Sequence, residues 1–198
     1  LHLCHHNLET IETNKYDSNN AKHKLLLEVC MAAKYEGDLI KTHYTPHQEK
    51  YKNTGTASQL CTVLARSFAD IGDIIRGKDL YLGNKKKNER ETEREKLERY
   101  LINIFKKIHG GLTRGKQNEE IEARYKDKDE NYFQLREDWW TANRATIWEA
   151  LTCEACGTYF RQTCGSGKTA TLASNKCRCP NGNNQVPTYF DYVPQFLR

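Results

Sequence analysis

Eight cysteines, spread from residue 4 to residue 179, constrain this 198-residue chain more than any other feature. An even number of widely spaced cysteines is typical of disulfide bonds formed in an oxidising compartment. Buried free thiols in a cytosolic protein are the alternative, and eight is a heavy load for a reducing compartment. Because only 37% of the residues are hydrophobic, crosslinks would supplement a modest core in one domain or two closely joined subdomains. The cysteines are Cys4, Cys30, Cys61, Cys153, Cys156, Cys164, Cys177 and Cys179.

A zinc cluster is a second interpretation of the five cysteines between Cys153 and Cys179. Thiolates at short spacing suit tetrahedral zinc, but zinc modules usually show two similar paired knuckles. Here one pair is C-x-x-C and the other is C-x-C, and a metal site would leave the three N-terminal cysteines without a role. The spacing therefore favours disulfides and predicts no metal and no cofactor.

The positive charge is concentrated in one segment, residues 84–116, which we call the basic segment. It holds 11 Lys/Arg and 5 Asp/Glu, a net +6, so the rest of the chain sums to about −1. Such a segment favours an anionic partner such as a sulfated glycan, nucleic acid or a lipid surface. A solvated helix face is the commoner meaning of an isolated basic run, and glutamates interrupt this one. The candidate binding residues are Lys85, Lys86, Lys87, Arg90, Arg94, Lys96, Arg99, Lys106, Lys107, Arg114 and Lys116.

Neither a membrane span nor a signal peptide is visible. No stretch approaches the ~20 apolar residues that a spanning helix needs, and the start lacks a basic-then-apolar pattern. The chain begins at Leu1 and ends on an apolar-rich run, residues 189–197, that should continue into more protein. We therefore expect it to be a piece of a larger protein.

Apolar periodicity predicts four helices and an all-α fold with long connections. The first is expected at about 20–39, followed by a polar loop at 42–55 that contains Pro46. The second should follow a capping box at Thr56–Gln59 and stop at Gly77. The third is expected from about Lys87 to His109, ended by the two glycines that follow, with a loop or frayed helix at 112–131. A fourth should include Leu135, Trp139, Ala142, Ile147, Ala150 and Leu151, and residues 157–187 should form an irregular, disulfide-held loop.

Motifs that would carry catalysis are weak. Residues 165–169 (GSGKT) look like the end of a phosphate-binding loop, but the required earlier glycine is replaced by Gln162 and no buried strand precedes it. The histidines lie at the start of the chain, on a polar stretch or at a helix end. No Ser/His/Asp or Cys/His set can be argued from the sequence, so an enzyme is not expected.

Several segments together resemble the Duffy-binding-like family, and in combination the alpha class found at the head of Plasmodium falciparum erythrocyte membrane protein 1. The hallmark helix of the family is matched by residues 65–77 (ARSFADIGDIIRG). The other matching segments are 1–4 (LHLC) with 7–9 (NLE), 27–37 (LEVCMAAKYEG), 136–140 (REDWW) with 143–144 (NR) and 147–148 (IW), and 191–198 (DYVPQFLR).

The resemblance implies a helical-bundle adhesion module on the outer face of the infected erythrocyte membrane. Residues 1–55 would be the later part of subdomain 1, and residues 56–198 a subdomain 2 bundle truncated before subdomain 3. Alpha-class heads are associated with rosetting through heparan sulfate-like glycans, blood-group sugars or complement receptor 1, or with support of a neighbouring receptor-binding module. The expected partners are a host receptor or sulfated glycan, adjacent domains of the parent protein and antibodies, with no nucleic acid and with membrane contact only through the parent protein.

The family also implies a pairing of the cysteines. Cys61 should bond Cys164, and Cys30 should bond Cys153. Cys4 would pair with a cysteine upstream of the chain, and Cys156 departs from the family pattern and would bond Cys177 or Cys179. The alternative from another class is a zinc-stabilised nucleic-acid-binding protein that uses the basic helix 84–116; it predicts bound zinc and free thiols.

Overall fold

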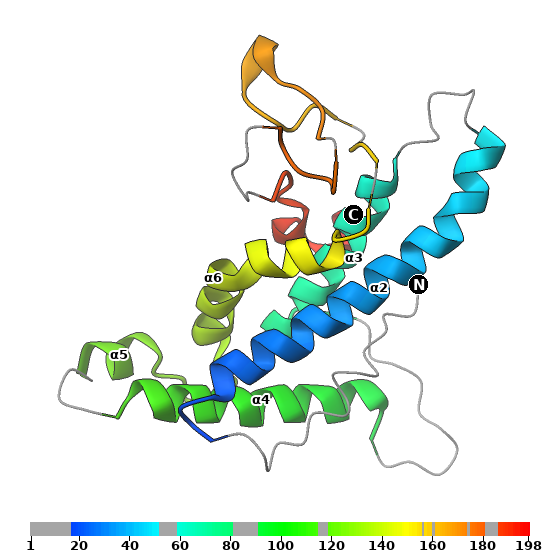
Figure 1. Ribbon diagram of the computed structural model, residues 1–198. Coiled ribbons are helices and arrows are strands. Elements are labelled where there is room, and N and C mark those ends of the chain that lie inside the picture. The colour runs from blue at the N-terminus through cyan, green and yellow to red at the C-terminus, as the bar shows by residue number, and fades with distance from the viewer. Residues whose placement is uncertain are drawn as a thin grey trace. The chain divides into compact units, whose positions relative to one another are not determined.

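A computed structural model describes residues 17–51, 59–80, 91–114, 119–155, 157–159, 161–173, 175–180 and 186–198. These residues form five α-helices, and the part that follows them is irregular (Figure 1). The expected all-α class with long connections is confirmed. Extended backbone pairs in an isolated antiparallel bridge between Cys164 and Thr171. The elements are α2 (Ala21–Tyr51), α3 (Leu60–Arg76), α4 (Glu93–Leu112), α5 (Glu119–Arg124), α6 (Phe133–Leu151) and the 3-10 turns η2 (Gly167–Thr169), η3 (Phe190–Tyr192) and η4 (Gln195–Leu197).

Helix α3 forms as its apolar stripe predicts. Its core side is buried along the whole helix, and Leu64, Phe68 and Ile75 are inaccessible to solvent. The helix ends at Gly77, whose φ of +73° suits glycine. The Gly77 N–H donates to the Ile74 carbonyl at 3.1 Å and the next amide donates to the Asp73 carbonyl at 2.8 Å, which is the Schellman arrangement. The predicted stop is confirmed, while Thr56 of the predicted capping box lies outside the described residues.

Helix α2 is longer than the sequence predicted. The stretch 42–51, expected to be a loop, is helical, and Pro46 lies inside the helix. Proline has no N–H, so a helix that contains it lacks one backbone hydrogen-bond donor. Threonine hydroxyls nearby donate additional hydrogen bonds to backbone carbonyls. Thr42 Oγ1 donates to the Asp38 carbonyl at 2.8 Å and Thr45 Oγ1 donates to the Lys41 carbonyl at 2.9 Å. This end of α2 is exposed, where water can satisfy the remaining carbonyl.

Helix α4 begins later and ends later than predicted. Thr92 caps it: its hydroxyl accepts from the Glu95 N–H at 3.1 Å, and the Glu95 carboxylate accepts from the Thr92 N–H at 2.6 Å. This reciprocal capping box moves the start from Lys87 to Glu93. The helix then continues through both glycines to Leu112. A glycine lowers helix stability without ending a helix whose opposite face is buried.

The last helices and the loop after them follow the prediction. Helix α6 spans the expected tryptophans, of which Trp140 and Trp148 are almost fully buried. The stretch 112–131 contains the short helix α5. The predicted irregular, disulfide-held loop is confirmed, because the described part of 157–187 contains the 3-10 turn η2, isolated bridge pairing and the Cys164–Cys179 disulfide, with no α-helix.

The described residues belong to two compact units that interleave along the chain. One comprises Cys30–Gly72 with Arg144–Arg198, and the other comprises His5–Val29 with Asp73–Asn143. We call them the loop-bearing unit and the α4 unit. Helices α2, α3 and α6 each contribute residues to both. The division at residue 55 suggested by the family stays a prediction.

The core of the loop-bearing unit brings α2, α3 and α6 together. Phe68 meets Trp148 edge-to-face, with ring centroids 5.2 Å apart. Gly37 permits a close approach to α6, since a Cβ at this position would lie 2.0 Å from the Leu151 carbonyl oxygen. The buried Ser67 hydroxyl donates to the Glu36 carboxylate at 3.1 Å. Only glycine at position 37 lets α2 and α6 pack at this distance.

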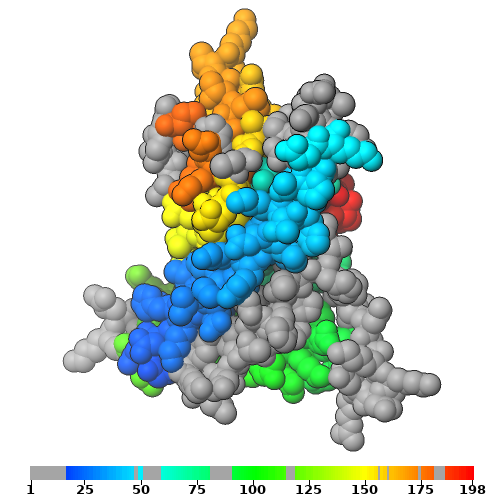
Figure 2. Space-filling view, turned by 45° about the vertical axis from the view of Figure 1, so that its right-hand side comes forward, coloured from blue at the N-terminus to red at the C-terminus, as the bar shows by residue number. Residues whose placement is uncertain are grey.

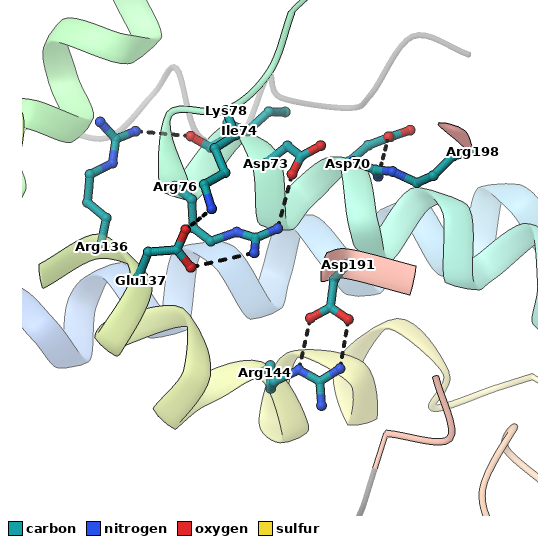
Figure 3. Close-up of polar contacts among 10 residues, drawn as sticks. All are labelled: Asp70, Asp73, Ile74, Arg76, Lys78, Arg136, Glu137, Arg144, Asp191 and Arg198. Atoms are coloured by element: carbon teal, nitrogen blue, oxygen red, sulfur yellow. Dashed lines mark hydrogen bonds and ion pairs between the residues drawn. The ribbon is translucent and has the colours of Figure 1, made fainter. Parts of the chain in front are cut away.

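The core of the α4 unit is organised around the buried Arg136 of α6. Its Nε donates to the Ile75 carbonyl at 2.6 Å and its Nη2 to the Ile74 carbonyl at 3.1 Å, so the side chain satisfies backbone groups at the end of α3 (Figure 3). Its Nη1 and Nη2 donate to the Glu98 carboxylate on α4, at 2.5 and 3.0 Å. Phe105 packs edge-to-face on Trp139 at 6.1 Å beside this cluster. One charged side chain thus links three helices of the unit.

One side of α2 exposes apolar side chains. Met31, Tyr35 and Leu39 recur every four residues and are 40%, 52% and 44% exposed. Figure 2 shows α2, coloured blue to cyan, lying open on one face of the molecule. Within the described part of the chain, no helix combines the length and apolar character that membrane crossing requires.

Two disulfides join cysteines of the described residues, and their pairing differs from the family-based expectation. Cys61 bonds Cys177 and Cys164 bonds Cys179, so the predicted Cys61–Cys164 bond is wrong. Cys30 and Cys153, expected to bond each other, are both free thiols. The physical reason is that the chain after α6 folds back so that the buried Cys177, and not Cys164, reaches the start of α3.

The remaining cysteine predictions follow from this pairing. Cys156 cannot bond Cys177 or Cys179, because both are already paired. Cys4 and Cys156 themselves lie outside the described residues.

Candidate functional site

The described part of the basic segment lies on and just after α4. Lys96 and Lys107 are half-buried on the helix, and Arg114 is exposed just beyond it. Arg94, Arg99 and Lys106 also lie on α4. The other predicted binding residues, Lys85, Lys86, Lys87, Arg90 and Lys116, lie outside the described residues.

Acidic neighbours engage Arg94, Arg99 and Lys106. Arg94 is largely buried, and its Nε lies 3.1 Å from the Asp79 carboxylate. Burial lowers the pKa of Arg94, and the nearby Asp79 and Glu98 carboxylates oppose that effect. This arginine therefore serves the internal structure of the unit and is poorly placed to meet a ligand.

The other two ion pairs lie at the surface of the α4 unit. Arg99 lies 3.1 Å from the Glu91 carboxylate, and Lys106 Nζ donates to the Glu130 carboxylate at 2.7 Å. The hydrogen bond with Glu130 raises the pKa of Lys106. Exposed pairs of this kind are weak, so an anionic ligand could compete for the two cations. The described part of the segment is thus partly neutralised by acidic residues both within the segment and outside it.

A pocket of about 1120 Å³ lies in the irregular part of the loop-bearing unit, and we call it the loop pocket. Its volume lies slightly above the range of ~300–1,000 Å³ typical of ligand sites. Aromatic rings from Tyr159, Tyr189 and Phe190 line it together with four threonines and Arg161. The Cys164–Cys179 disulfide forms part of the wall. The pocket therefore combines apolar surfaces with hydroxyl groups and one cation.

The walls of the pocket are held by a hydrogen-bond network. The Tyr159 hydroxyl and Thr188 Oγ1 lie 3.2 Å apart, and Thr188 Oγ1 accepts from the Phe190 N–H at 3.0 Å. The bridge between Cys164 and Thr171 adds backbone hydrogen bonds of 3.0 and 2.8 Å. Because hydrogen bonds already hold these wall residues in place, they would lose little conformational entropy if a ligand bound.

Arg144 of α6 fixes the segment that carries Tyr189. Its guanidinium makes a two-pronged contact with the buried Asp191, at 2.9 and 2.7 Å, and donates to the Thr188 carbonyl at 2.9 Å (Figure 3). The same guanidinium lies 5.6 Å from the centre of the Tyr189 ring and 5.7 Å from that of Phe68. This stacked, two-pronged geometry is the one in which arginine is not replaceable by lysine.

Sequence reasoning missed the loop pocket, although one signal was visible. Residues 157–190 contain four Lys/Arg and no Asp or Glu, a net +4. Lys168 and Lys176 are exposed, and Arg178 pairs at 3.5 Å with Glu149 of α6. Residues 157–190 have fewer cations than residues 84–116, but no Asp or Glu in the same stretch offsets their positive charge.

Two further chemistries, zinc binding and phosphate binding, were disfavoured by the sequence, and the structure bears on both. Cys164, Cys177 and Cys179 are consumed by disulfides, so the zinc cluster and the zinc-stabilised nucleic-acid-binding alternative are wrong. Within the described residues, no group of His, Cys, Asp and Glu could hold a metal ion. The GSGKT stretch forms the 3-10 turn η2 in place of the strand-to-helix loop that phosphate binding needs.

Comparison with known proteins places these features in context. The model of the Duffy binding domain family matches residues 1–198. A PfEMP1 DBLbeta domain from IT4var13, solved bound to ICAM-1, is 30% identical with a TM-score of 0.66 over 99% of this chain. A second PfEMP1 DBLb domain, solved bound to human ICAM-1, is 29% identical with a TM-score of 0.50 over 75% of this chain. The chain spans 40% and 28% of those two solved chains. No curated protein matches it.

Proposed function

The chain belongs to the Duffy-binding domain family, and on that basis we propose that it acts as a host-cell adhesion module. The observation that carries the proposal is the family match over the whole of residues 1–198. The similarity to PfEMP1 domains solved in complex with ICAM-1 supports it, because those domains bind a cell-surface protein. The motifs of residues 65–77 and 191–198 further suggest the alpha class, whereas the two solved relatives are beta-class domains.

The finer parts of the proposal concern partner and location. The partner would be a red-cell or endothelial receptor: a heparan sulfate-like glycan, a blood-group sugar or complement receptor 1. The parent protein would present this domain on the infected erythrocyte, where adjacent domains and antibodies also meet it. A sulfated chain on the basic segment would have to compete with the acidic neighbours of Arg94, Arg99 and Lys106, and it would also engage the other basic residues of the segment.

Binding of the chain to red cells and to immobilised heparin tests the proposal. We expect Lys85, Lys86 and Lys87, all changed to Glu, to lower the salt concentration at which the protein leaves heparin. The matched control changes Lys22, Lys34 and Lys41, three exposed lysines of α2, to Glu and gives the same net charge. Clustered cations bind a polyanion more tightly than dispersed ones, so the control should elute later than the first variant.

Two results would count against the proposal in different ways. Equal elution of the two triple variants would mean that net charge alone sets retention and that the basic segment is not the glycan site. Failure of the unaltered protein to attach to red cells or endothelial cells would contradict the adhesive function itself.

A further inference from the structure

The two disulfides described above differ in their access to solvent. Cys61 and Cys177 are both inaccessible, so their bond is enclosed in the core of the loop-bearing unit. Cys164 and Cys179 both line the loop pocket, and Cys179 is half-buried. Thiol–disulfide exchange requires a thiolate to reach one of the bonded sulfur atoms, so access separates inert disulfides from reactive ones. The Cys164–Cys179 bond is therefore the one that a dissolved thiol can attack without unfolding the helices.

The charges along this stretch favour a thiol that carries negative charge. Residues 157–190 contain no Asp or Glu, and the exposed Lys168 and Lys176 lie four residues after Cys164 and three residues before Cys179. Cations near a disulfide attract an anionic nucleophile, and they also stabilise the thiolate that leaves. Because the attacking group and the leaving group are both anions, an acid-free, cationic stretch assists both parts of the reaction.

Opening this bond would change the pocket and leave the helical core in place. Cys164 would keep the backbone hydrogen bonds of its bridge to Thr171, at 3.0 and 2.8 Å. Cys177 would keep its bond to Cys61 and would still accept from the indole N–H of Trp148 at 3.2 Å. The part of the pocket wall formed by the Cys164–Cys179 bond would be lost. The reaction would thus remodel a surface site on a scaffold that a second disulfide holds together.

We propose that the Cys164–Cys179 disulfide is a modification site for anionic small-molecule thiols, which open it in the folded protein. The thiolate attacks the more accessible Cys179 sulfur and forms a mixed disulfide with it. The bond to Cys164 breaks, its electron pair stays on the Cys164 sulfur, and that sulfur takes a proton from water. A second thiolate then attacks the sulfur of the bound small molecule, which releases Cys179 as a thiolate and leaves the two small thiols joined by a disulfide. The two thiol molecules supply both electrons, and the site does not depend on the adhesive function.

Differential alkylation of the 198-residue protein measures the exchange. The free thiols of Cys30 and Cys153 are first blocked with N-ethylmaleimide. The protein is then treated with mercaptoethanesulfonate, an anionic thiol, and newly released thiols are trapped with iodoacetamide and assigned by peptide mapping. We expect Cys164 and Cys179 to be released roughly tenfold or more faster than the Cys61–Cys177 pair, because the buried bond must wait for local unfolding. The circular dichroism of the helices should not change during the faster reaction.

The charge of the thiol tests the role of the nearby cations. Mercaptoethanol is neutral and cysteamine is cationic, and the two are compared with mercaptoethanesulfonate. Each rate is divided by the rate of the same thiol with bis(hydroxyethyl) disulfide, an uncharged reference, so that intrinsic reactivity cancels. We expect the normalised rate of the anionic thiol to exceed that of the cationic thiol by roughly threefold or more at about 10 mM salt, where the screening length is about 30 Å. The ratio should fall towards one at about 1 M salt.

A pair of lysine variants locates the effect. Lys168→Gln combined with Lys176→Gln should lower the anion-to-cation ratio to roughly half or less, because it removes the exposed cations nearest in sequence to the two cysteines. The matched control is Lys34→Gln combined with Lys41→Gln, which removes two exposed lysines of α2 and gives the same net charge. The control should leave the ratio unchanged. All four side chains are exposed, so both variants should keep the fold.

Several results would overturn the assignment. Equal release rates for both disulfides, or release only in urea, would mean that exchange requires unfolding and that the pocket gives no access. Equal normalised rates for the three thiols, or equal effects of the two lysine pairs, would remove the preference for anionic thiols. The Cys164→Ala/Cys179→Ala variant completes the test: thiol treatment of the folded variant should release no cysteine at the rate seen in the unaltered protein, and such a release would place the reactive bond elsewhere.

Discussion

The two disulfides should contribute unequally to stability, because they close loops of very different length. Cys61 and Cys177 are 116 residues apart in sequence, whereas Cys164 and Cys179 are 15 apart. In the chain-entropy model, closing these loops removes unfolded-state freedom worth about 5 kcal/mol and about 3 kcal/mol. The long-range bond should therefore be the more important of the two by about 2 kcal/mol.

Packing around the Cys61–Cys177 bond should also make it the more stabilising of the two disulfides. Cys61 and Cys177 are both inaccessible to solvent. The indole N–H of Trp148 donates to the Cys177 carbonyl at 3.2 Å, so the disulfide also fixes a contact of the core. Replacing both cysteines by alanine leaves small apolar groups and adds no buried hydroxyl. A loss of about 5 kcal/mol is a large part of the 5–15 kcal/mol that stabilises a typical domain.

Urea unfolding followed by tryptophan fluorescence and circular dichroism measures the difference. With a slope of about 2–3 kcal/mol/M, the Cys61→Ala/Cys177→Ala variant should unfold about 2 M earlier than the unaltered protein. The Cys164→Ala/Cys179→Ala variant should unfold about 1 M earlier. Equal midpoints, or a larger loss in the second variant, would refute the argument. So would non-reducing peptide mapping that found Cys61 bonded to Cys164.

Three further predictions concern single residues. Gly37→Ala should destabilise by about 1–3 kcal/mol in urea titrations, because its Cβ would lie 2.0 Å from the Leu151 carbonyl oxygen. Gly110→Ala is the control: a Cβ at this helical position would meet no atom within 4 Å, so this change should stabilise the protein by up to ~1 kcal/mol. If both alanine variants changed the free energy of unfolding in the same direction, the packing argument would be contradicted. Arg136→Met should cost about 3 kcal/mol or more, since it leaves a carboxylate and two helix-end carbonyls without their donor; a loss below ~1 kcal/mol would contradict this. Burial raises the pKa of the Cys30 thiol from 9.0 to about 11, so iodoacetamide at pH 8 should modify it roughly 100-fold more slowly in the folded than in the urea-unfolded protein; equal rates by mass spectrometry would disprove this.

The parts of the fold that the sequence predicted well are set by neighbouring residues. Helix α3 has its apolar stripe and the Gly77 stop within one short stretch, so local periodicity and backbone freedom were sufficient. The limits of α4 were less accurate, because the charged residues before Thr92 are individually compatible with a helix. Only the reciprocal bonds of Thr92 and Glu95 identify the start.

The end of α2 shows where a local rule gave the wrong result. Pro46 in a polar stretch predicts a loop, because proline disrupts the regular hydrogen bonds of a helix. Here the helix reaches Tyr51 on an exposed side, where the threonine hydroxyls bond to backbone carbonyls and solvent surrounds the rest. The cost of one lost hydrogen bond is smaller there than it would be in a core.

Cysteine pairing could not be predicted from local patterns or from the family expectation. Cys164 and Cys177 are both in the irregular region, so either could meet Cys61 as far as the sequence is concerned. The outcome is decided by the path of the chain after α6, where the indole N–H of Trp148 donates to the carbonyl of the buried Cys177. Such contacts join residues that are far apart in sequence, and no window of the sequence contains them.

The charge available at the surface also depends on residues that are far apart in sequence, and this matters for function. The sum over residues 84–116 overestimated the available charge, because Asp79 and Glu130, which neutralise Arg94 and Lys106, lie outside that window. The smaller sum over 157–190 contains no acid to subtract, and Glu149 is an outside carboxylate that reaches it, through Arg178. A ligand interacts with charge left after folding, and not with charge counted along the chain.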